Sequence, residues 1–277
     1  MPLAGDRFEV KAVKNLLPID SSHGHANGRG SGPRMEADAK VMQGLMTPLA
    51  RITHTSLADE CYRVLRGNIL SLNLRPGSPL DEVQLAANLG ISKTPVRETI
   101  ARLAGEGLIT SGPGRKSYVA RLSAQTIAEV AAIRTILEAG SLLELTPRLT
   151  DEILAQLAES HQRASSSVRA EDVDTFLDSN NDFHMLLIEQ TGNETLRSVM
   201  HGLIDQAARV SAAIFLSGDQ DELIAVGIES HAMILAALFD RDAERAAAQI
   251  RKDIRMTRDA ALAPGMHEKI ESLNYDG

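Results

Sequence analysis

Residues 80–109 read "LDEVQLAANLGISKTPVRETIARLAGEGLI", and this stretch decides the fold of the first half of the chain. Apolar residues recur at helical spacing on both sides of Gly90, a residue type that commonly ends a helix. The stretch therefore predicts two helices joined by a short turn. In the second of them Val96, Ile100 and Leu103 fall on one face and are expected to pack inward.

The start of this second helix is the candidate recognition element. Ser92 stands where it can cap the helix, and Pro95 is tolerated in the first turn, where N–H groups lack helical partners. Lys93, Thr94 and Arg97 are then expected to project from the N-terminal part of the helix. In helix–turn–helix proteins this part enters the major groove, where an arginine can bind a guanine with two hydrogen bonds.

The flanking segments complete a winged helix–turn–helix. Before the stretch, "TSLADECYRVLRGNILSLNL" (55–74) predicts a helix that the breakers "RPGS" (75–78) end. After it, the β-prone runs Leu108–Ser111 and Ser117–Ala120 flank the turn former "GPGRK" and predict a hairpin. Helix, helix–turn–helix and hairpin together define a DNA-binding domain over residues 51–122.

The tip of the predicted hairpin adds to the DNA-binding hypothesis. Gly114 allows the backbone to approach DNA closely, and Arg115 and Lys116 supply positive charge for phosphates. The alternative is that Lys93 and Arg97 are ordinary solvated charges, as on many helix pairs. The hairpin that follows the helix pair favours DNA binding.

Beyond Ser123 every segment has helical periodicity. This pattern predicts an all-α bundle of about six helices over residues 123–262, and the fold class is mainly α. The expected helices lie near residues 123–146, 150–170, 172–191, 194–216, 220–239 and 242–261. Residues 1–50, with the Gly- and Ser-rich "SSHGHANGRGSGPR", predict a flexible extension, and 263–277 are expected to form a C-terminal tail.

Composition restricts the class of protein. The net charge is -8, yet residues 54–122 hold nine Lys or Arg and six Asp or Glu, whereas residues 123–277 hold 13 and 26. A basic module is thus joined to an acidic one, which indicates a division of labour. The single cysteine, Cys61, excludes an intramolecular disulfide, and no apolar run is long enough for a membrane span. We therefore expect a cytoplasmic protein.

The stretch "LRPGSPLDEVQLAANLGISKTPVRETIARLAGEGLI" (74–109) resembles the DNA-binding domain of GntR-type bacterial transcription regulators. The resemblance implies DNA contacts from the recognition helix and from the wing tip. These positions are Ser92, Lys93, Thr94, Pro95, Arg97 and Gly114. Two departures leave the operator sequence open, since Lys93 stands where arginine is frequent and Val83 stands where some members have a contacting arginine.

The second half resembles the FCD effector-binding domain of the FadR-like branch, notably in "IAEVAAIRTILEAGSLLEL", "NNDFHMLLIEQTGN" and "ESHAMILAALFDRDAERAAAQIRKDI". Many such domains bind a divalent metal through an Asp and three His. The corresponding residues here are Asn180, His184, His231 and Asp253. Independently, His231 and Asp253 lie at similar distances from the turn at Asp240, so antiparallel helices would bring them to nearly equal depth.

This set departs from the family's metal ligands, because Asn180 replaces the aspartate and Asp253 replaces one histidine. Two interpretations are therefore open. Two imidazoles and one carboxylate are compatible with zinc, nickel or manganese. Alternatively, Asn180, His184, His231 and Asp253 form a metal-free polar pocket that contacts an effector directly.

Two arginines are candidate effector ligands in the helical domain. By the resemblance Arg134 lines the effector pocket, where its guanidinium would suit a carboxylate; the alternative is an ion pair with Glu138, four residues on. Arg209 is a second candidate. The full set of candidate effector-binding residues is Arg134, Asn180, His184, Arg209 and His231.

The leading hypothesis is a homodimeric transcription regulator, most simply a repressor, that binds a short palindromic operator in double-stranded DNA. A small organic acid or related metabolite would switch it by binding the helical domain. A metal-dependent enzyme that uses His184, His231 and Asp253 is the alternative, but no HExxH or GxSxG motif is present. A winged module that contacts only proteins is a third class, and it predicts no salt-dependent DNA affinity.

Overall fold

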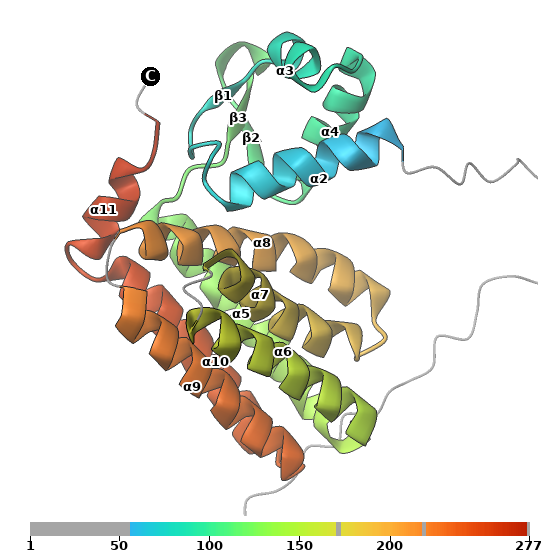
Figure 1. Cartoon of the computed structure of the whole chain (residues 1–277), viewed down its shortest axis with the longest axis vertical. Helices are drawn as coiled ribbons and strands as arrows, with labels where there is room; N and C mark the ends of the chain where they lie inside the picture. The colour runs from blue at the N-terminus through green and yellow to red at the C-terminus, as the bar shows by residue number, and fades with distance from the viewer. Residues whose placement is uncertain (1–55, 170–172, 218–219, 276–277) are drawn as a thin grey trace, which may run out of the picture. The chain divides into compact units, whose positions relative to one another are not determined.

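The computed structural model describes residues 56–169, 173–217 and 220–275, all of which belong to one unit, His54–Gly277. It is mainly helical, as predicted, with a small sheet in its N-terminal part (Figure 1). The extension predicted for residues 1–50 lies outside the described residues.

Three helices form the frame of the N-terminal domain: α2 (Leu57–Leu70), α3 (Glu82–Leu89) and α4 (Lys93–Gly105). The Ser56 side chain caps α2, and the Asp81 carboxylate caps α3 by accepting two backbone N–H bonds. Their shared core consists of apolar side chains that are almost fully buried. It includes Leu65, Ile69, Val96, Leu103, Leu108 and Val119. The predicted helix–turn–helix is confirmed.

The first helix ends earlier than the sequence predicted. α2 stops at Leu70, and Leu72 takes a left-handed backbone conformation with φ of 62° before the Arg75–Ser78 breakers are reached. Leu72 is buried in a cluster with Leu122 and Ile127 from the second half of the chain. The early helix end goes together with the packing of Leu72 against residues distant in the sequence. Such packing cannot be read from the local periodicity.

The wing is a three-stranded antiparallel sheet in the order β1-β3-β2. β2 (Ile109–Ser111) and β3 (Ser117–Val119) form the predicted hairpin around the short 3-10 turn η1 (Pro113–Arg115). Gly114 adopts φ of 69° in this turn, a conformation that favours glycine. The sequence did not predict β1 (Pro79–Leu80), which pairs with β3.

The second half is the expected helical bundle, and each of its six main helices begins and ends within two residues of the prediction. They are α5 (Ala124–Leu145), α6 (Asp151–Arg169), α7 (Val173–Glu189), α8 (Glu194–Leu216), α9 (Gln220–Phe239) and α10 (Ala243–Leu262). A short 3-10 segment, η2 (Thr146–Arg148), follows α5.

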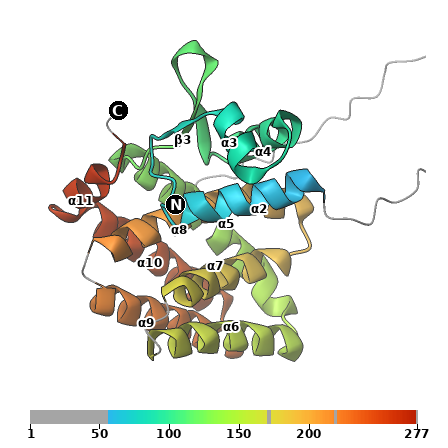
Figure 2. The same cartoon turned by 45° about the horizontal axis from the view of Figure 1, so that its top comes forward.

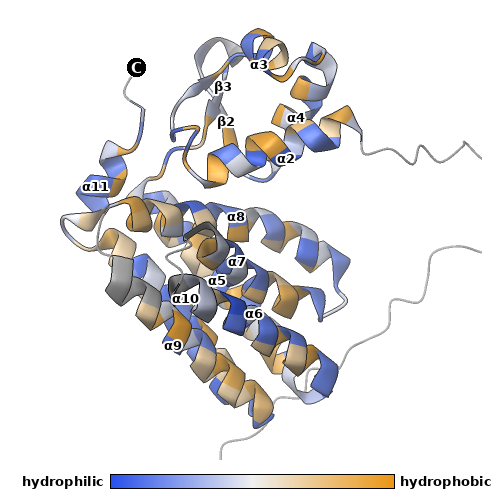
Figure 3. Ribbon diagram, viewed as in Figure 1, coloured by the Kyte–Doolittle hydropathy of each residue, from blue (hydrophilic) through white to orange (hydrophobic). Residues whose placement is uncertain are grey.

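Apolar faces of these helices meet in one core. α10 packs against α5 and α9, and α6 packs against α7, as the two ribbon views show (Figures 1 and 2). Hydrophobic and hydrophilic residues alternate around most of these helices (Figure 3). Phe183, Ile234, Leu238 and Ile250 have no exposed surface. This core gives the buried polar residues of the bundle, among them Arg134, His184 and Asp253, a largely apolar setting.

The segment expected to be a tail contains another helix, α11 (Met266–Ser272). Its Ile270 side chain is fully buried among residues of the bundle. Beyond α11 the Asn274 side chain exchanges two hydrogen bonds of 3.1 Å with the backbone of Leu122, between the two domains. The sequence-based expectation of a tail is therefore wrong for these residues, because α11 is too short to give a clear periodic signal.

Replacing Ile270 with alanine should lower the free energy of unfolding by about 2–5 kcal/mol, because it removes a fully buried side chain. Urea denaturation followed by circular dichroism measures this change. Glu268→Ala, at an exposed position of the same helix, is the control and should change stability by less than about 0.5 kcal/mol. Equal stabilities of the two variants would contradict the docking of α11.

Candidate functional site

The N-terminal turns of α4 present the predicted recognition residues to solvent. Ser92, Lys93, Thr94 and Arg97 are exposed, and Pro95 is partly buried. On the opposite face Val96 and Leu103 of α4 are fully buried, as expected. Ser92 occupies the N-cap position but its side chain makes no capping hydrogen bond, contrary to the expectation. The hydroxyl is thus not committed to the helix.

Arg97 already has an acidic partner within the domain. Its guanidinium donates to the Glu82 carboxylate at the start of α3, at 2.9 Å from Nη2 and 3.2 Å from Nε, and this partner raises the pKa of Arg97. The Arg97 side chain is 69% exposed, so the pair is open to solvent. Such a pair contributes little to stability, and it holds the guanidinium on the surface that α3 and α4 share.

The wing and α4 bring positive charge to the same neighbourhood. The pKa of Asp81 is lowered, first by the backbone N–H bonds of the α3 cap and further by the charges of Lys93 and Lys116. Two lysines, one from α4 and one from the wing, therefore lie near the start of α3. Gly114 is exposed at the wing tip, whereas the Arg115 side chain lies outside the described part of the chain. The predicted DNA-contacting residues that are described thus share one neighbourhood.

A cavity of about 340 Å³ opens among α5, α7, α8, α9 and α10 of the bundle. This volume is in the range of small-molecule sites. Four of the predicted residues line it: Arg134, Asn180, His184 and Asp253. The remaining wall is largely apolar and includes Phe176, Ile214 and Phe215.

Arg134 is buried in this wall and is only partly satisfied. Its Nε donates to Glu138 Oε1 at 2.6 Å, so the ion pair considered as the alternative is present. The Arg134 Nη2 atom, however, is buried without a hydrogen-bond partner among the described residues. A buried donor without a partner is costly, and an arginine beside a cavity can recover the cost by binding a ligand oxygen.

His184, His231 and Asp253 form a buried cluster at the inner side of the cavity. The two histidine Nε2 atoms are 3.3 Å apart, and the Asp253 carboxylate oxygens lie 3.5 Å from His184 Nε2 and 3.9 Å from His231 Nε2. In a tetrahedral zinc site with zinc–nitrogen distances of about 2.0–2.1 Å, two imidazole nitrogens are about 3.3 Å apart. The donor set therefore fits a divalent metal. Asn180 lines the same cavity.

Glu138 orients this cluster, a role that the sequence reasoning missed. One of its oxygens lies 2.6 Å from His184 Nδ1, which directs the opposite nitrogen, Nε2, toward His231 and Asp253. Carboxylates commonly hold metal-binding histidines in this way. Burial opposes ionisation of Glu138, but Arg134 and His184 lower its pKa to about 2. The i, i+4 spacing of Arg134 and Glu138 was the signal available in the sequence.

Burial also shifts the pKa values of His231 and Asp253, in each case toward the neutral form. It lowers the pKa of His231 well below the usual value, with a further contribution from His184. It raises the pKa of Asp253. His231 also stacks on Phe183, with ring centroids 4.1 Å apart. A neutral imidazole in a fixed orientation is the form that binds metals.

Two predicted effector-binding residues do not line the large cavity. Arg209 lines a smaller cavity beside it, and His231 lies next to His184 and Asp253, which do line the large one.

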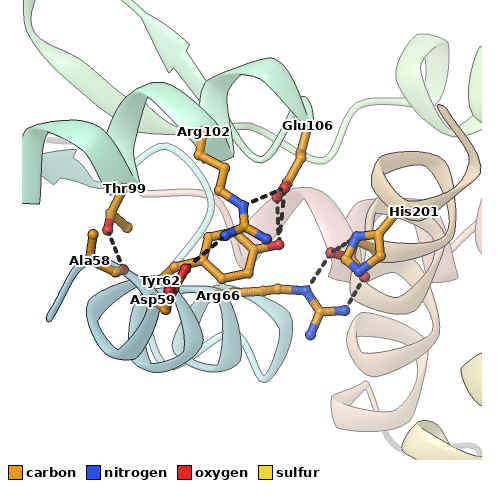
Figure 4. A network of polar contacts seen from close by, with 9 residues as sticks. Ala58, Asp59, Tyr62, Arg66, Thr99, Arg102, Glu106 and His201 are labelled. Carbon is orange, nitrogen blue, oxygen red and sulfur yellow. Dashed lines mark hydrogen bonds and ion pairs between the residues drawn. The ribbon is translucent and has the colours of Figure 1, made fainter. Parts of the chain in front are cut away.

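The helix α8 connects the cavity with the DNA-binding domain. On one side, Arg66 of α2 forms a bidentate ion pair with the buried Asp205 carboxylate, at 2.6 Å from Nε (Figure 4). Gln206 donates to the Glu106 carbonyl oxygen at the end of α4, and a Cβ on Gly202 would lie only 2.7 Å from that oxygen. Other α8 residues, among them Ser211, line the cavity.

These features define a class of protein in which a winged helix–turn–helix domain is joined to a helical domain with an internal cavity. Residues 40–119 match the bacterial regulatory proteins of the gntR family, and residues 129–256 match the FCD domain. An HTH-type transcriptional regulator of Streptomyces ambofaciens is 32% identical over 176 residues, which are 60% of this chain and 74% of the relative. The chain belongs to the GntR family and carries an FCD effector-binding domain. Its relatives are transcription regulators, not enzymes.

Further relatives have the same character. The transcriptional repressor RspR of Escherichia coli is 27% identical over 67% of this chain and 80% of its own length. The Nta operon transcriptional regulator of Aminobacter aminovorans is 29% identical over 65% of this chain and 82% of its own length.

Solved structures agree on the fold. Escherichia coli McbR superposes with a TM-score of 0.65 at 23% identity and covers 73% of this chain and 95% of its own. A GntR protein of Rhodococcus sp. RHA1 superposes with a TM-score of 0.66 at 22% identity, over 76% of this chain and 99% of its own. Within the described ranges, no helix has the length and apolar character that crossing a membrane requires.

Replacing Arg97 with alanine should weaken binding to a specific operator about 5- to 150-fold, because one arginine–guanine pair contributes about 1–3 kcal/mol of discrimination. The operator is first selected from random DNA duplexes with the wild-type chain, and affinity is measured by fluorescence anisotropy at fixed salt. The control is Arg148→Ala, which removes the same charge from an exposed position of the helical domain. Unchanged affinity of the Arg97 variant would contradict the assignment of the recognition helix.

Proposed function

We propose that the protein is a repressor that binds a short palindromic operator as a homodimer and is released from it by a small organic acid. The acid binds in the cavity of the helical domain. The observation that carries this proposal is Arg134, a buried cation in the cavity wall whose Nη2 atom has no hydrogen-bond partner among the described residues. A carboxylate is the ligand group that matches a guanidinium in charge and in geometry.

The cavity favours an acid with an apolar part. Arg134 is the cationic member of the lining, and Asn180 and Asn181 offer amide groups for hydroxyl or carbonyl oxygens. Phe176 and Phe215, whose rings lie 6.2 Å apart, offer apolar surface. A ligand with one carboxylate, further polar oxygens and a short carbon chain suits this lining.

A divalent metal, such as zinc, nickel or manganese, is part of the proposal. His184, His231 and Asp253 would hold it, and Asn180 would add a weak oxygen contact. When bound, the metal supplies a Lewis-acidic position for an oxygen of the effector. Glu138 keeps the His184 ring in the required orientation.

Coupling to DNA is assigned to α8. An acid that binds the DNA-free arrangement more tightly than the DNA-bound one shifts the population toward release. Ser211 and Ile214 would sense the ligand on the cavity side of α8, and Asp205 and Gln206 contact the DNA-binding domain on the other. A small displacement of α8 would therefore change the seating of α2 and α4.

The homodimer and the sign of regulation rest on separate observations. A two-fold operator requires a two-fold protein, and α5 exposes the apolar side chains of Ile133 (44%) and Ile136 (71%), which offer a surface to a second copy. The relative RspR is a transcriptional repressor, which supports repression rather than activation by this protein. Binding to the chromosome would place the protein in the cytoplasm.

A thermal-shift screen of organic acids tests the effector proposal, since a ligand of the folded state raises the melting temperature. At least one carboxylic acid should stabilise the wild-type chain. Arg134→Lys keeps the charge beside Glu138 but loses the forked donor geometry, so its affinity for that acid should fall about tenfold or more. Arg163→Lys, at a position that is 48% exposed, should behave as wild type. Equal affinities of the two variants would exclude Arg134 as a ligand.

Metal removal tests the second part of the proposal. Chelation followed by addition of zinc should raise the melting temperature and load one zinc per chain, as measured by calorimetry and elemental analysis. His231→Gln should abolish zinc loading, whereas His267→Gln in α11 should not. Absence of zinc, nickel and manganese uptake by the wild-type chain would leave the metal-free polar pocket as the correct description.

A further inference from the structure

Arg209 of α8 is a buried cation without an acidic partner. Only 1% of its surface is exposed, and no carboxylate of the described residues forms an ion pair with it. Burial lowers the pKa of Arg209 to about 10, so the side chain still carries its charge at neutral pH. Buried charges are normally paired, because removing an unpaired ion from water costs several kcal/mol.

The Nε donor of this guanidinium is buried and has no hydrogen-bond partner among the described residues. The Nη2 atom of the same guanidinium donates to the backbone carbonyl oxygen of Ala120, which follows β3 and begins the linker to the helical domain. Arg209 therefore has both an uncompensated charge and an unsatisfied donor.

A second cavity lies at this arginine. It measures about 40 Å³ and is bordered by the linker residues Ala120–Leu122, by α5, by α8 and by α10. Among the described residues that line it, four are arginines and none is acidic: Arg121, Arg134, Arg209 and Arg258.

The other arginines of this lining have partners elsewhere. Arg134 pairs with Glu138, Arg258 pairs with Asp259, and Arg121 donates to the Tyr275 carbonyl oxygen. The positive charge of the small cavity thus centres on Arg209.

The size of the cavity restricts the ligand. A water molecule needs about 10–15 Å³ of such space, so about 40 Å³ holds two or three waters or one small ion. An organic acid with a carbon chain belongs in the larger cavity instead. A water could satisfy the Nε donor, but only an anion would also compensate the charge.

We propose that Arg209 and the Ala120–Leu122 linker form a binding site for a small monovalent anion, of which chloride is the simplest. The small cavity shares part of its wall, Arg134, Ala207 and Thr257, with the effector cavity. Arg209 and the linker line only the small cavity, so the anion site does not depend on the assignment of the effector or of the metal. The anion accepts a hydrogen bond from Arg209 Nε and neutralises the buried charge. Because the Ala120 carbonyl oxygen bonds to the same guanidinium, an occupied site fixes the linker between the DNA-binding and helical domains.

Chlorine-35 NMR on the full chain tests this site. Chloride exchanging with the protein should show excess line broadening that decreases as added bromide displaces the chloride. The broadening should fall by at least half in Arg209→Met. This variant removes the buried charge and keeps an unbranched, flexible side chain. Arg255→Met, which removes an exposed arginine of α10, should retain the wild-type broadening. Equal broadening in the Arg209 and Arg255 variants would overturn the proposal.

Crystals of the wild-type chain soaked in bromide give a readout that does not depend on folding of a variant. An anomalous peak within hydrogen-bond distance of Arg209 Nε is expected. Water alone at this position, without anomalous signal, would overturn the proposal.

Discussion

α8 packs closely against the DNA-binding domain, and this packing joins the two halves of the chain. Gly202, Asp205, Gln206 and Arg209 follow the spacing i, i+3, i+4, i+7 and so occupy one side of the helix. Each contacts the preceding domain or its linker. Gly202 has no side chain and so allows the Glu106 backbone to approach closely, and Asp205 forms an ion pair with Arg66. Gln206 and Arg209 each donate a hydrogen bond to a backbone carbonyl oxygen. Since other residues of α8 line the cavity, this one helix contacts both the cavity and the DNA-binding domain.

The two halves of the chain differ in charge and in where their polar groups lie. The basic N-terminal domain carries the surface of α4 and the wing, where Lys93, Arg97 and Lys116 are exposed. The acidic helical domain keeps its functional polar groups inside, around Arg134 and the His184 cluster. The ion pair of Arg66 with Asp205 joins a cation of the first domain to an anion of the second.

Most of the fold could be predicted because its signals are local. The helical periodicity after Ser123 gave six helices close to their observed ends, and the turn residues at Gly90 and Gly114 marked the helix–turn–helix and the wing. The early end of α2, the strand β1 and the short helix α11 could not be predicted, because each depends on contacts with residues distant in the sequence. The left-handed Leu72, for example, packs with Leu122 and Ile127.

The members of the candidate cluster were predicted, but the contacts that hold them were not. Asn180, His184, His231 and Asp253 could be named from spacing and resemblance; the two histidines and Asp253 do converge, and Asn180 lines the same cavity. The links among them could not be named: Glu138 serves both Arg134 and His184, and Arg209 faces a separate cavity. These partnerships depend on how helices are rotated against one another, which periodicity leaves undetermined.

We propose that α8 transmits the state of the cavity to the DNA-binding domain. Hydrogen–deuterium exchange of the full chain, with and without the organic acid that most raises the melting temperature, tests this coupling. We expect backbone amides of residues 105–122 to change their protection together with those of α8. We also expect Asp205→Asn to reduce the change in residues 105–122 while the acid still binds. Changes confined to α5, α7, α9 and α10 would contradict this coupling.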